Sequence, residues 1–349
     1  MKGPSTRIIV SIFEAALNRQ LDLQVRDLEV SNLSQVMIKY RNQLPQLNNG
    51  LFLSDGGLET TLIFHERIPL PHFAAFDLLK DQAGTEVLRR YFNRYAELAL
   101  ARGVGVVLES PTWRANRDWA AKLGYDAATL AEANRKSIQL LEQVRASFEH
   151  GGPAIVISGN LGPRGDGYRP EARMTIAEAQ AYHAPQVEVF AASNADMVAG
   201  FTMNYAEEAI GITLAARAAT MPVAISFTLE TDGRLPSGQT LADAIQRTDA
   251  TSAAYPAYYM INCAHPTHFE SVLRRGGAWR NRIRGLRANA SKRSHAELDS
   301  CPDLDLGNPA ELAHEYRALR QWLPNLTLLG GCCGTDHRHV EAICTACQE

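Results

Sequence analysis

The chain has 349 residues, of which 46% are hydrophobic and 21% charged, and its formal net charge at pH 7 is -3. These values are ordinary for a soluble globular protein; the slight acidity argues against a nucleic-acid partner, and the absence of any run of about 18 apolar residues argues against a membrane span. Six cysteines in a chain of this length do not form the disulfide framework of a small secreted domain, so we expect reduced thiols in the cytoplasm.

The first 46 residues are expected to be an N-terminal extension, helical or disordered, ahead of one domain that spans residues 47–349. The apolar run over residues 8–13 resembles a weak signal peptide, but Glu14 interrupts this run and no small-residue cleavage site follows. Met37 stands shortly before the first clear strand pattern, and we hypothesise that translation of the native protein starts there.

From residue 51 onward, short apolar runs alternate with longer segments of helical periodicity. Most of the runs are apolar throughout, which is typical of parallel strands buried on both faces. The predicted strands are 51–54, 104–109, 154–158, 197–201, 223–228, 258–262, 283–288 and 327–329. The predicted helices are 85–102, 127–148, 175–193, 206–219, 241–248, 267–275, 309–322 and 336–347. Asn308 is expected to cap the helix at 309 and Thr335 the helix at 336.

Eight β-α units in succession predict an α/β fold, a (β/α)8 TIM barrel in a single domain. Neither a G-x-G-x-x-G nor a G-x-x-x-x-G-K-[ST] motif follows the first strand, as a nucleotide-binding open sheet would often have. The stretch 291–309 is interpreted as an irregular loop after the seventh strand. In such a barrel the chemistry sits at the C-terminal ends of the strands, so the residues found there are the first candidates for a site.

Glycines and polar residues do gather at these strand ends. Asp55-Gly56-Gly57 follows the first strand, Glu109 ends the second, Asn262-Cys263 ends the sixth, Asn289 follows the seventh and Gly330-Gly331-Cys332-Cys333-Gly334-Thr335 follows the eighth. The three thiols Cys263, Cys332 and Cys333 predict a Zn²⁺ site with one coordination position left open. Three thiolates give the ion a formal charge of -1, which disfavours hydrolysis and favours binding a thiol as its thiolate; the chemistry indicated is alkyl transfer to a thiol.

Other interpretations of the cysteines and histidines stay open at this point. Cys332 and Cys333 could be a redox or structural pair, and Cys263 alone could be a buried core thiol. Cys344 and Cys347 are interpreted as positions one helical turn apart, and Cys301 has no evident partner. The histidines that could bind a metal, although each fits a polar loop or surface position better, are His65, His265, His337 and His339.

Together these motifs resemble the homocysteine S-methyltransferase family, from about residue 51 to the last helix. The segments 159–163 and 226–227 carry the same resemblance. It implies a (β/α)8 barrel, one catalytic Zn²⁺ held by Cys263, Cys332 and Cys333, and transfer of a methyl group to homocysteine to give methionine. Its partners would be small molecules, homocysteine and a methyl donor, with no nucleic acid or membrane and with an oligomer possible. The expected substrate contacts are Asp55, Gly56, Gly57, Glu109, Asn262 and Asn289.

The methyl donor is open at this stage. A single barrel of this size resembles the S-methylmethionine or S-adenosylmethionine type of the family. Betaine is an alternative, with Phe76, Trp113 and Tyr168 as a possible aromatic cage around its quaternary ammonium. Methylation of a different thiol, and a barrel that only binds zinc or senses redox state, are further alternatives.

One departure from the family concerns the fourth strand. The family typically has a Glu-Thr pair there, whose Glu receives the amino group of homocysteine, but here Phe201 precedes Thr202. We hypothesise that Glu109 supplies the missing carboxylate from another strand end at the same mouth. The alternative is a solvated Glu109, or one paired with Arg114 or Arg117.

Overall fold

The structure is a computed structural model and describes residues 38–148, 152–170, 173–301 and 303–348. The hypothesised start at Met37 and the preceding residues of the predicted extension lie outside the described residues. The compact unit begins at Ile38. Residues 38–46 pack on the N-terminal end of the barrel: the Tyr40 amide donates to Asp196 Oδ1 (2.8 Å), and Arg41 Nη2 donates to the Ala195 carbonyl (2.7 Å).

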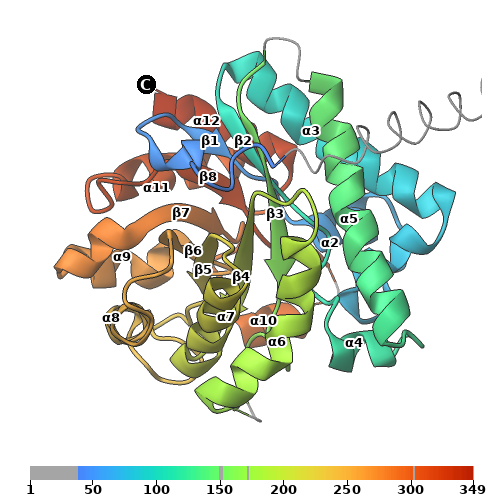
Figure 1. The fold of residues 1–349 in the computed structure, drawn as a ribbon. Helices are drawn as coiled ribbons and strands as arrows, with labels where there is room; N and C mark the ends of the chain where they lie inside the picture. Colours follow the sequence, from blue (N-terminus) through green and yellow to red (C-terminus); the bar gives the residue numbers. More distant parts are fainter. Residues whose placement is uncertain (1–37, 149–151, 171–172, 302, 349) are drawn as a thin grey trace, which may run out of the picture. The chain divides into compact units, whose positions relative to one another are not determined.

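Eight parallel strands close into a barrel in the order β1-β2-β3-β4-β5-β6-β7-β8 (Figure 1), which confirms the predicted fold. Their bounds are β1 Phe52–Leu53, β2 Gly105–Glu109, β3 Ile155–Leu161, β4 Met197–Met203, β5 Val223–Phe227, β6 Tyr258–Asn262, β7 Ile283–Ala288 and β8 Leu328–Gly331. Each lies within a few residues of its predicted run. The C-terminal ends of all eight therefore open at one mouth.

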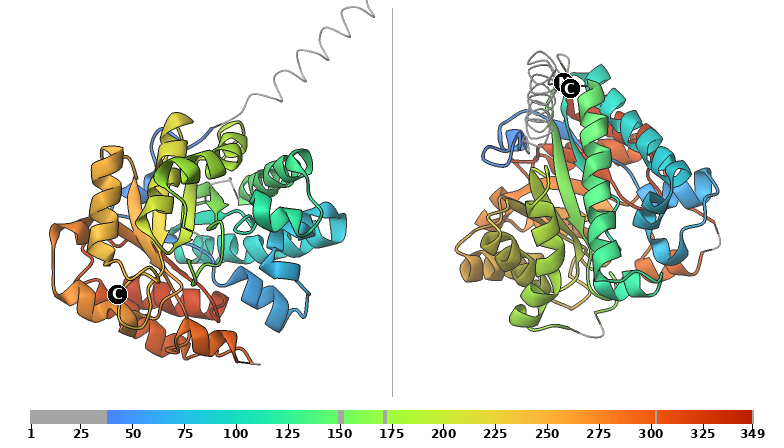
Figure 2. Two further views of the ribbon diagram at one scale, coloured as in Figure 1. Left: turned by 90° about the horizontal axis from the view of Figure 1, so that it is seen from below. Right: turned by 45° about the vertical axis from the view of Figure 1, so that its right-hand side comes forward.

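Helices surround the strands (Figures 1 and 2). The helices are α2 Leu58–Thr60, α3 Gln82–Arg102, α4 Arg117–Ala121, α5 Ala127–Phe148, α6 Ile176–Ala191, α7 Ala206–Ala218, α8 Leu241–Ser252, α9 Pro266–Arg274, α10 His295–Asp299, α11 Pro309–Leu319 and α12 His337–Gln348. The shorter turns are the π-helical η2 Thr61–His65 and the 3-10 segments η1 Pro45–Leu47, η3 Pro71–Phe73, η4 Ala75–Lys80 and η5 Ala278–Arg282.

The helix caps were predicted with mixed success. Asn308 caps α11, since its side chain accepts from the amides of Ala310 (2.9 Å) and Glu311 (3.3 Å). The prediction for Thr335 is wrong, because α12 begins at His337, one residue later than predicted, and Asp336 Oδ1 accepts from the Arg338 amide (2.9 Å). The stretch 291–309 is not irregular throughout, because it contains α10.

The core has two layers, one inside the barrel and one between the strands and the surrounding helices. Alternate strand residues fill the two layers, which explains why the strands are apolar on both faces. The inner layer holds Phe52, Val107, Val156, Met197, Ala199, Phe201, Ala224, Tyr258, Met260 and Leu328. Phe201 also lines the cavity at the mouth, so it forms the boundary between the barrel interior and the site.

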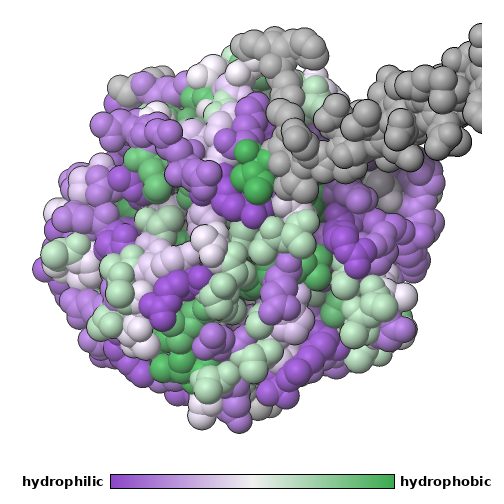
Figure 3. Space-filling view, in the orientation of Figure 1, coloured by the Kyte–Doolittle hydropathy of each residue, from purple (hydrophilic) through white to green (hydrophobic). Residues whose placement is uncertain are grey.

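Hydrophobic residues on the face shown in Figure 3 are dispersed among hydrophilic ones. Among the described residues the large hydrophobic side chains that are exposed are Ile38, Phe73 and Leu100. Phe73 lies at the rim of the cavity. No helix in the described part of the chain is both long enough and apolar enough to cross a membrane.

Candidate metal centre and its cavity

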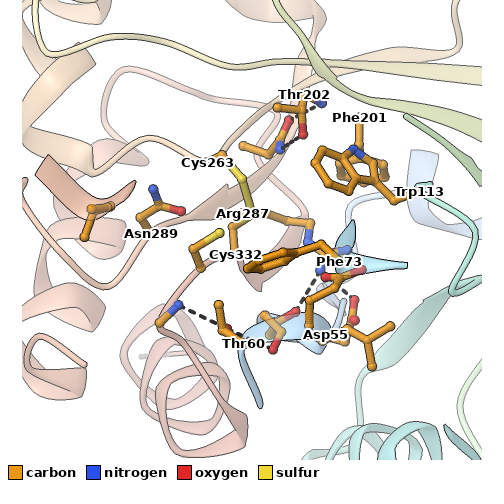
Figure 4. Close-up of a pocket in the computed structure, with 18 of the residues that line it drawn as sticks. Asp55, Thr60, Phe73, Trp113, Phe201, Thr202, Cys263, Arg287, Asn289 and Cys332 are labelled. Atoms are coloured by element: carbon orange, nitrogen blue, oxygen red, sulfur yellow. Dashed lines mark hydrogen bonds and ion pairs between the residues drawn. A yellow bond between two sulfur atoms is a disulfide. The ribbon is translucent and has the colours of Figure 1, made fainter. Parts of the chain in front are cut away.

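A cavity of about 470 Å³ occupies the C-terminal mouth of the barrel. Residues that follow or end β1, β2, β4, β6, β7 and β8 contribute to its lining (Figure 4). All the residues predicted to form the site lie there, including the three cysteines. The lining residues that match the sequence prediction are Asp55, Gly56, Gly57, Glu109, Asn262, Cys263, Asn289, Cys332 and Cys333.

The sulfur atoms of Cys263, Cys332 and Cys333 all lie within 4.8 Å of one another. Cys263 and Cys332 are joined as a disulfide (Figure 4). The Cys333 sulfur lies within 4.8 Å of both of their sulfurs. A tetrahedral ion with metal–sulfur bonds of about 2.3 Å separates its sulfur ligands by about 3.8 Å. Once reduced, the three thiols therefore need only small side-chain rotations to bind one metal ion.

Strand β7 lies between β6 and β8 and holds both cysteine segments in place. The Cys263 amide donates to the Arg287 carbonyl (3.1 Å), and the Cys332 amide donates to the Ala288 carbonyl (2.8 Å). Cys263 adopts a left-handed backbone conformation with φ of 53°.

Glycines permit the close approach of the β1 turn to the cysteine turn. A Cβ added to Gly57 would lie 2.6 Å from the Cys332 carbonyl oxygen, and one added to Gly331 would lie 2.1 Å from Thr335 Oγ1. The Thr335 hydroxyl in turn donates to the Cys332 carbonyl (2.7 Å). The conformation of the double-cysteine turn thus depends on the glycines that mark it in the sequence.

The carboxylate of Asp55 is engaged by protein groups on both oxygens. Oδ1 pairs with Arg287 Nη2 at 2.7 Å, and Oδ2 accepts from the Tyr91 hydroxyl at 3.0 Å. Arg287 also donates to the Gly56 carbonyl (3.0 Å). The sequence prediction missed Arg287; the signal that could have found it is a charged residue next to Ala288, the last residue of a strand that ends at the barrel mouth.

Glu109 is 3% exposed, and neither of its carboxylate oxygens makes a hydrogen bond to a described residue. Burial raises the pKa of Glu109 to about 7, against the opposing effects of the Arg287 charge and of the nearby Ser158 hydroxyl. The alternative of a solvated or arginine-paired Glu109 is wrong. Arg114 stacks on Trp113 and donates to the Gly165 carbonyl, and Arg117 pairs with Asp118 at 3.5 Å.

The two predicted asparagines differ in whether their side-chain oxygens already accept hydrogen bonds. Asn262 Oδ1 accepts from the Thr202 amide (3.0 Å) and the Ser226 hydroxyl (2.6 Å), and its Nδ2 donates to Thr202 Oγ1 (2.9 Å). Asn262 therefore ties β4, β5 and β6 together. Asn289 lines the cavity, and its buried Oδ1 accepts no hydrogen bond from the described residues, so one acceptor there is unused.

Several lining residues were not predicted from the sequence. Glu59, in the short helix after β1, borders the cavity, and burial raises its pKa to about 7. Phe73 lies at the same opening (Figure 4). The proposed aromatic cage is partly wrong: Trp113 and Tyr168 line the cavity, but Phe76 is fully buried against Tyr125 and does not.

The remaining candidate ligands lie outside the sulfur cluster. Cys344 and Cys347 are buried on α12, as expected of positions one turn apart. Cys301 lines the cavity and accepts from Arg293 Nη1 (2.8 Å). Within the described part of the chain, no histidine or carboxylate joins the three-cysteine group. Three of the four candidate histidines lie near carboxylates instead, namely His65, His265 and His339.

Comparison with known proteins decides the family. The family model described as homocysteine S-methyltransferase matches residues 52–347. The chain belongs to this family. It is 29% identical to the homocysteine S-methyltransferase of Escherichia coli strain K12 over 259 residues, covering 64% of this chain and 76% of that one. Membership identifies the chain as a methyltransferase and confirms the resemblance that the cysteine motifs indicated.

Solved structures support the same fold. The oxidized form of the homocysteine methyltransferase MmuM from Escherichia coli superimposes with a TM-score of 0.67 at 22% identity, covering 86% of this chain and 97% of that one. Its metallated form gives 0.64 at 21% identity, covering 87% and 98%. At this identity the similarity supports the family barrel, and the functional assignment depends on the site of this chain.

Proposed function

We propose that this S-methyltransferase uses a bound Zn²⁺ ion to transfer a methyl group from a sulfonium donor to the thiol of homocysteine, giving methionine. The donors favoured are S-methylmethionine and S-adenosylmethionine. The observation that carries the proposal is the cluster of three cysteine sulfurs within 4.8 Å of one another, facing a cavity at the barrel mouth.

The donor set fits zinc. Cysteine thiolates are ligands that Zn²⁺ prefers, and a site with three protein ligands leaves the fourth position for a substrate. When bound, such an ion lowers the pKa of a substrate thiol and keeps its sulfur as a nucleophilic thiolate. Cys263, Cys332 and Cys333 would hold the ion. Asn289, whose Oδ1 has no partner, lies at the same cavity and can accept a hydrogen bond from the substrate.

Glu109 is our candidate receptor for the ammonium group of homocysteine. A buried carboxylate without a partner is costly, and pairing it with a cation offsets that cost. Phe201 stands where the family typically has a glutamate, and it offers an ammonium only its ring face. Glu109 lines the same cavity from the end of β2. The carboxylate that binds the ammonium group would thus lie at the end of β2 in this chain, instead of on β4 as is typical of the family.

The cavity favours a cationic donor. Glu59 and Glu109 border it as two carboxylates without ion pairs among the described residues, and Phe73 adds aromatic surface at the rim. The rings of Trp113 and Phe201 already face the guanidinium groups of Arg114 (4.1 Å) and Arg287 (5.1 Å). Betaine is less favoured than a sulfonium, because the expected cage lacks Phe76 and the Tyr168 ring already stacks on His295 at 4.0 Å. The walls of the cavity would place the donor methyl in line with the homocysteine sulfur.

The chemical step balances without a further reactant. The homocysteine sulfur donates an electron pair to the methyl carbon, while the bond between that carbon and the donor sulfur breaks. The donor leaves as a neutral thioether, and the thiol proton is released before the transfer. A sulfonium is already an activated leaving group, so the residues of the chain bind and orient the two substrates and exclude water.

The disulfide between Cys263 and Cys332 favours one second candidate, a barrel that binds zinc or senses redox state without turnover. A donor panel separates the two. Reduced, zinc-loaded protein is incubated with homocysteine and S-methylmethionine, S-adenosylmethionine or betaine, and methionine is measured by mass spectrometry. We expect methionine from a sulfonium donor in the native protein and in a Cys344→Ser control, and none in Cys333→Ser. No methionine from any donor would remove the proposed function.

A further inference from the structure

Arg287 lies at the centre of the barrel mouth and contacts each part of the site. It is 7% exposed and lines the cavity from β7. Its backbone carbonyl accepts from the Cys263 amide (3.1 Å), and its Nε donates to the carbonyl of Gly331 (3.0 Å), the residue before Cys332. Figure 4 shows the side chain beneath the sulfur pair, extending towards Asp55.

Only part of the guanidinium is used by the protein. Nη2 contacts Asp55 Oδ1 (2.7 Å) and donates to the Gly56 carbonyl (3.0 Å), and Nε is used by Gly331. Nη1 makes no hydrogen bond to the described residues, although the group borders the cavity. Asp55, Gly56 and Gly331 thus fix the plane of the guanidinium and leave one terminal nitrogen available.

Glu109 borders the same cavity with the opposite charge. Its two oxygens have no partner, and no ion pair within 4.0 Å joins it to Arg287. An arginine with a free terminal nitrogen and a carboxylate with two free oxygens are complementary to the two ends of a zwitterionic amino-acid head group. Both charges are buried, so a zwitterion between them would be stabilised more than at the surface.

We propose that Arg287 Nη1 receives the α-carboxylate of the acceptor amino acid, while Glu109 receives its ammonium. Asp55 is then a positioning residue that acts on the substrate through Arg287. The assignment rests on the proposed function, because it concerns the thiol acceptor of that reaction. It explains why the acceptor would be an α-amino acid rather than a simple thiol.

The test measures binding of homocysteine and its decarboxylated and deaminated analogues. Reduced protein is loaded with Co²⁺ in place of zinc, and the thiolate-to-cobalt absorption reports each dissociation constant. In the native protein, removing the α-carboxylate from the ligand is expected to weaken binding roughly 10- to 150-fold, the range for a hydrogen bond to a charged group. In Arg287→Gln, removing the α-carboxylate from the ligand should change binding less than about threefold, because the contact between the arginine and the carboxylate is already absent. Arg287→Lys should restore part of the discrimination.

Controls separate this role from a structural one. Arg284 lies on the same strand but outside the cavity lining. Arg284→Gln should therefore keep the native difference in affinity between homocysteine and its decarboxylated analogue. Metal content is measured for every variant. If Arg287→Gln weakened homocysteine and its decarboxylated analogue by the same factor, Arg287 would be only structural and the assignment would be overturned.

The native protein alone can also overturn the assignment. If it bound the decarboxylated analogue as tightly as homocysteine, Arg287 would not be the carboxylate receptor, whether or not the variants fold. If it bound none of the three thiols, the proposed function itself would fail and the receptor with it. Binding of all three with no dependence on the carboxylate would remove the receptor and leave the proposed function intact.

Discussion

Replacing Glu109 with glutamine should stabilise the substrate-free protein at alkaline pH and weaken its binding of homocysteine. The carboxylate is 3% exposed and has no hydrogen-bond partner, so the folded protein disfavours its ionised form. Its pKa of about 7 lies above the ordinary value of 4.5. Burial is the main cause, and the charge of Arg287 opposes it.

The magnitude follows from linkage between folding and proton binding. Below pH 4.5 the carboxyl group is protonated in the folded and unfolded chain alike. As the pH rises towards about 7, the folded protein retains the proton that the unfolded chain has released, so stability falls. Above that pH the loss is complete, and it amounts to about 3 kcal/mol of unfolding free energy. Glutamine has no such charge and should avoid the loss.

Urea unfolding of reduced, metal-loaded protein at pH 5 and pH 8 measures this effect. The difference in unfolding free energy, Glu109→Gln minus native, should become more positive by about 2 to 3 kcal/mol between the two pH values. Glu86→Gln is the matched control, because Glu86 is a solvent-facing carboxylate that pairs with Arg89 at 3.1 Å. Its difference should stay nearly constant with pH.

Homocysteine binding provides the second measurement on the same variant. Loss of the ammonium partner should weaken binding roughly 10- to 100-fold at pH 8, where Glu109 is ionised, and less at pH 6. A stability difference that does not change with pH would show that the carboxylate is hydrated or paired. Unchanged homocysteine affinity would refute its role as the ammonium receptor.

Further predictions concern the metal centre. Cys333→Ser should lower zinc affinity by more than the roughly 10- to 100-fold typical of residues that only support a ligand, whereas Cys344→Ser should leave it unchanged; metal titration of the reduced proteins checks both. Gly57→Ala would bring a Cβ to 2.6 Å from the Cys332 carbonyl oxygen, so it should cost roughly 1 to 3 kcal/mol of stability and reduce zinc content, as urea unfolding and metal analysis would show. Chelation of zinc should abolish methyl transfer but leave far-ultraviolet circular dichroism near its native value, because Cys263, Cys332 and Cys333 do not belong to the clusters of buried side chains that form the core.

The barrel was predictable because its signals are local and repeated. Eight apolar runs separated by helical patterns correspond to β1–β8, and the strand ends mark the mouth without any knowledge of side-chain contacts. The sulfur cluster was predictable for the same reason, since Cys263 and Cys332 each follow a strand. Boundaries and caps were less certain, as the shift of the α12 cap from Thr335 to Asp336 shows.

The substrate contacts were harder to predict because they depend on which polar groups the fold pairs with one another. The sequence cannot show that both Asp55 oxygens are occupied while both Glu109 oxygens are not. It also cannot show that, of the two arginines in β7, Arg287 lines the cavity and Arg284 does not. Such pairings depend on side chains that lie far apart in sequence and meet only at the mouth.

X-ray absorption at the zinc edge tests the central claim most directly, because it counts the sulfur neighbours of the bound metal. In the reduced protein we expect three sulfur ligands, from Cys263, Cys332 and Cys333, and one lighter ligand. Addition of homocysteine should replace the lighter ligand and raise the count to four sulfurs. A sulfur count that does not change when homocysteine is added would contradict the account.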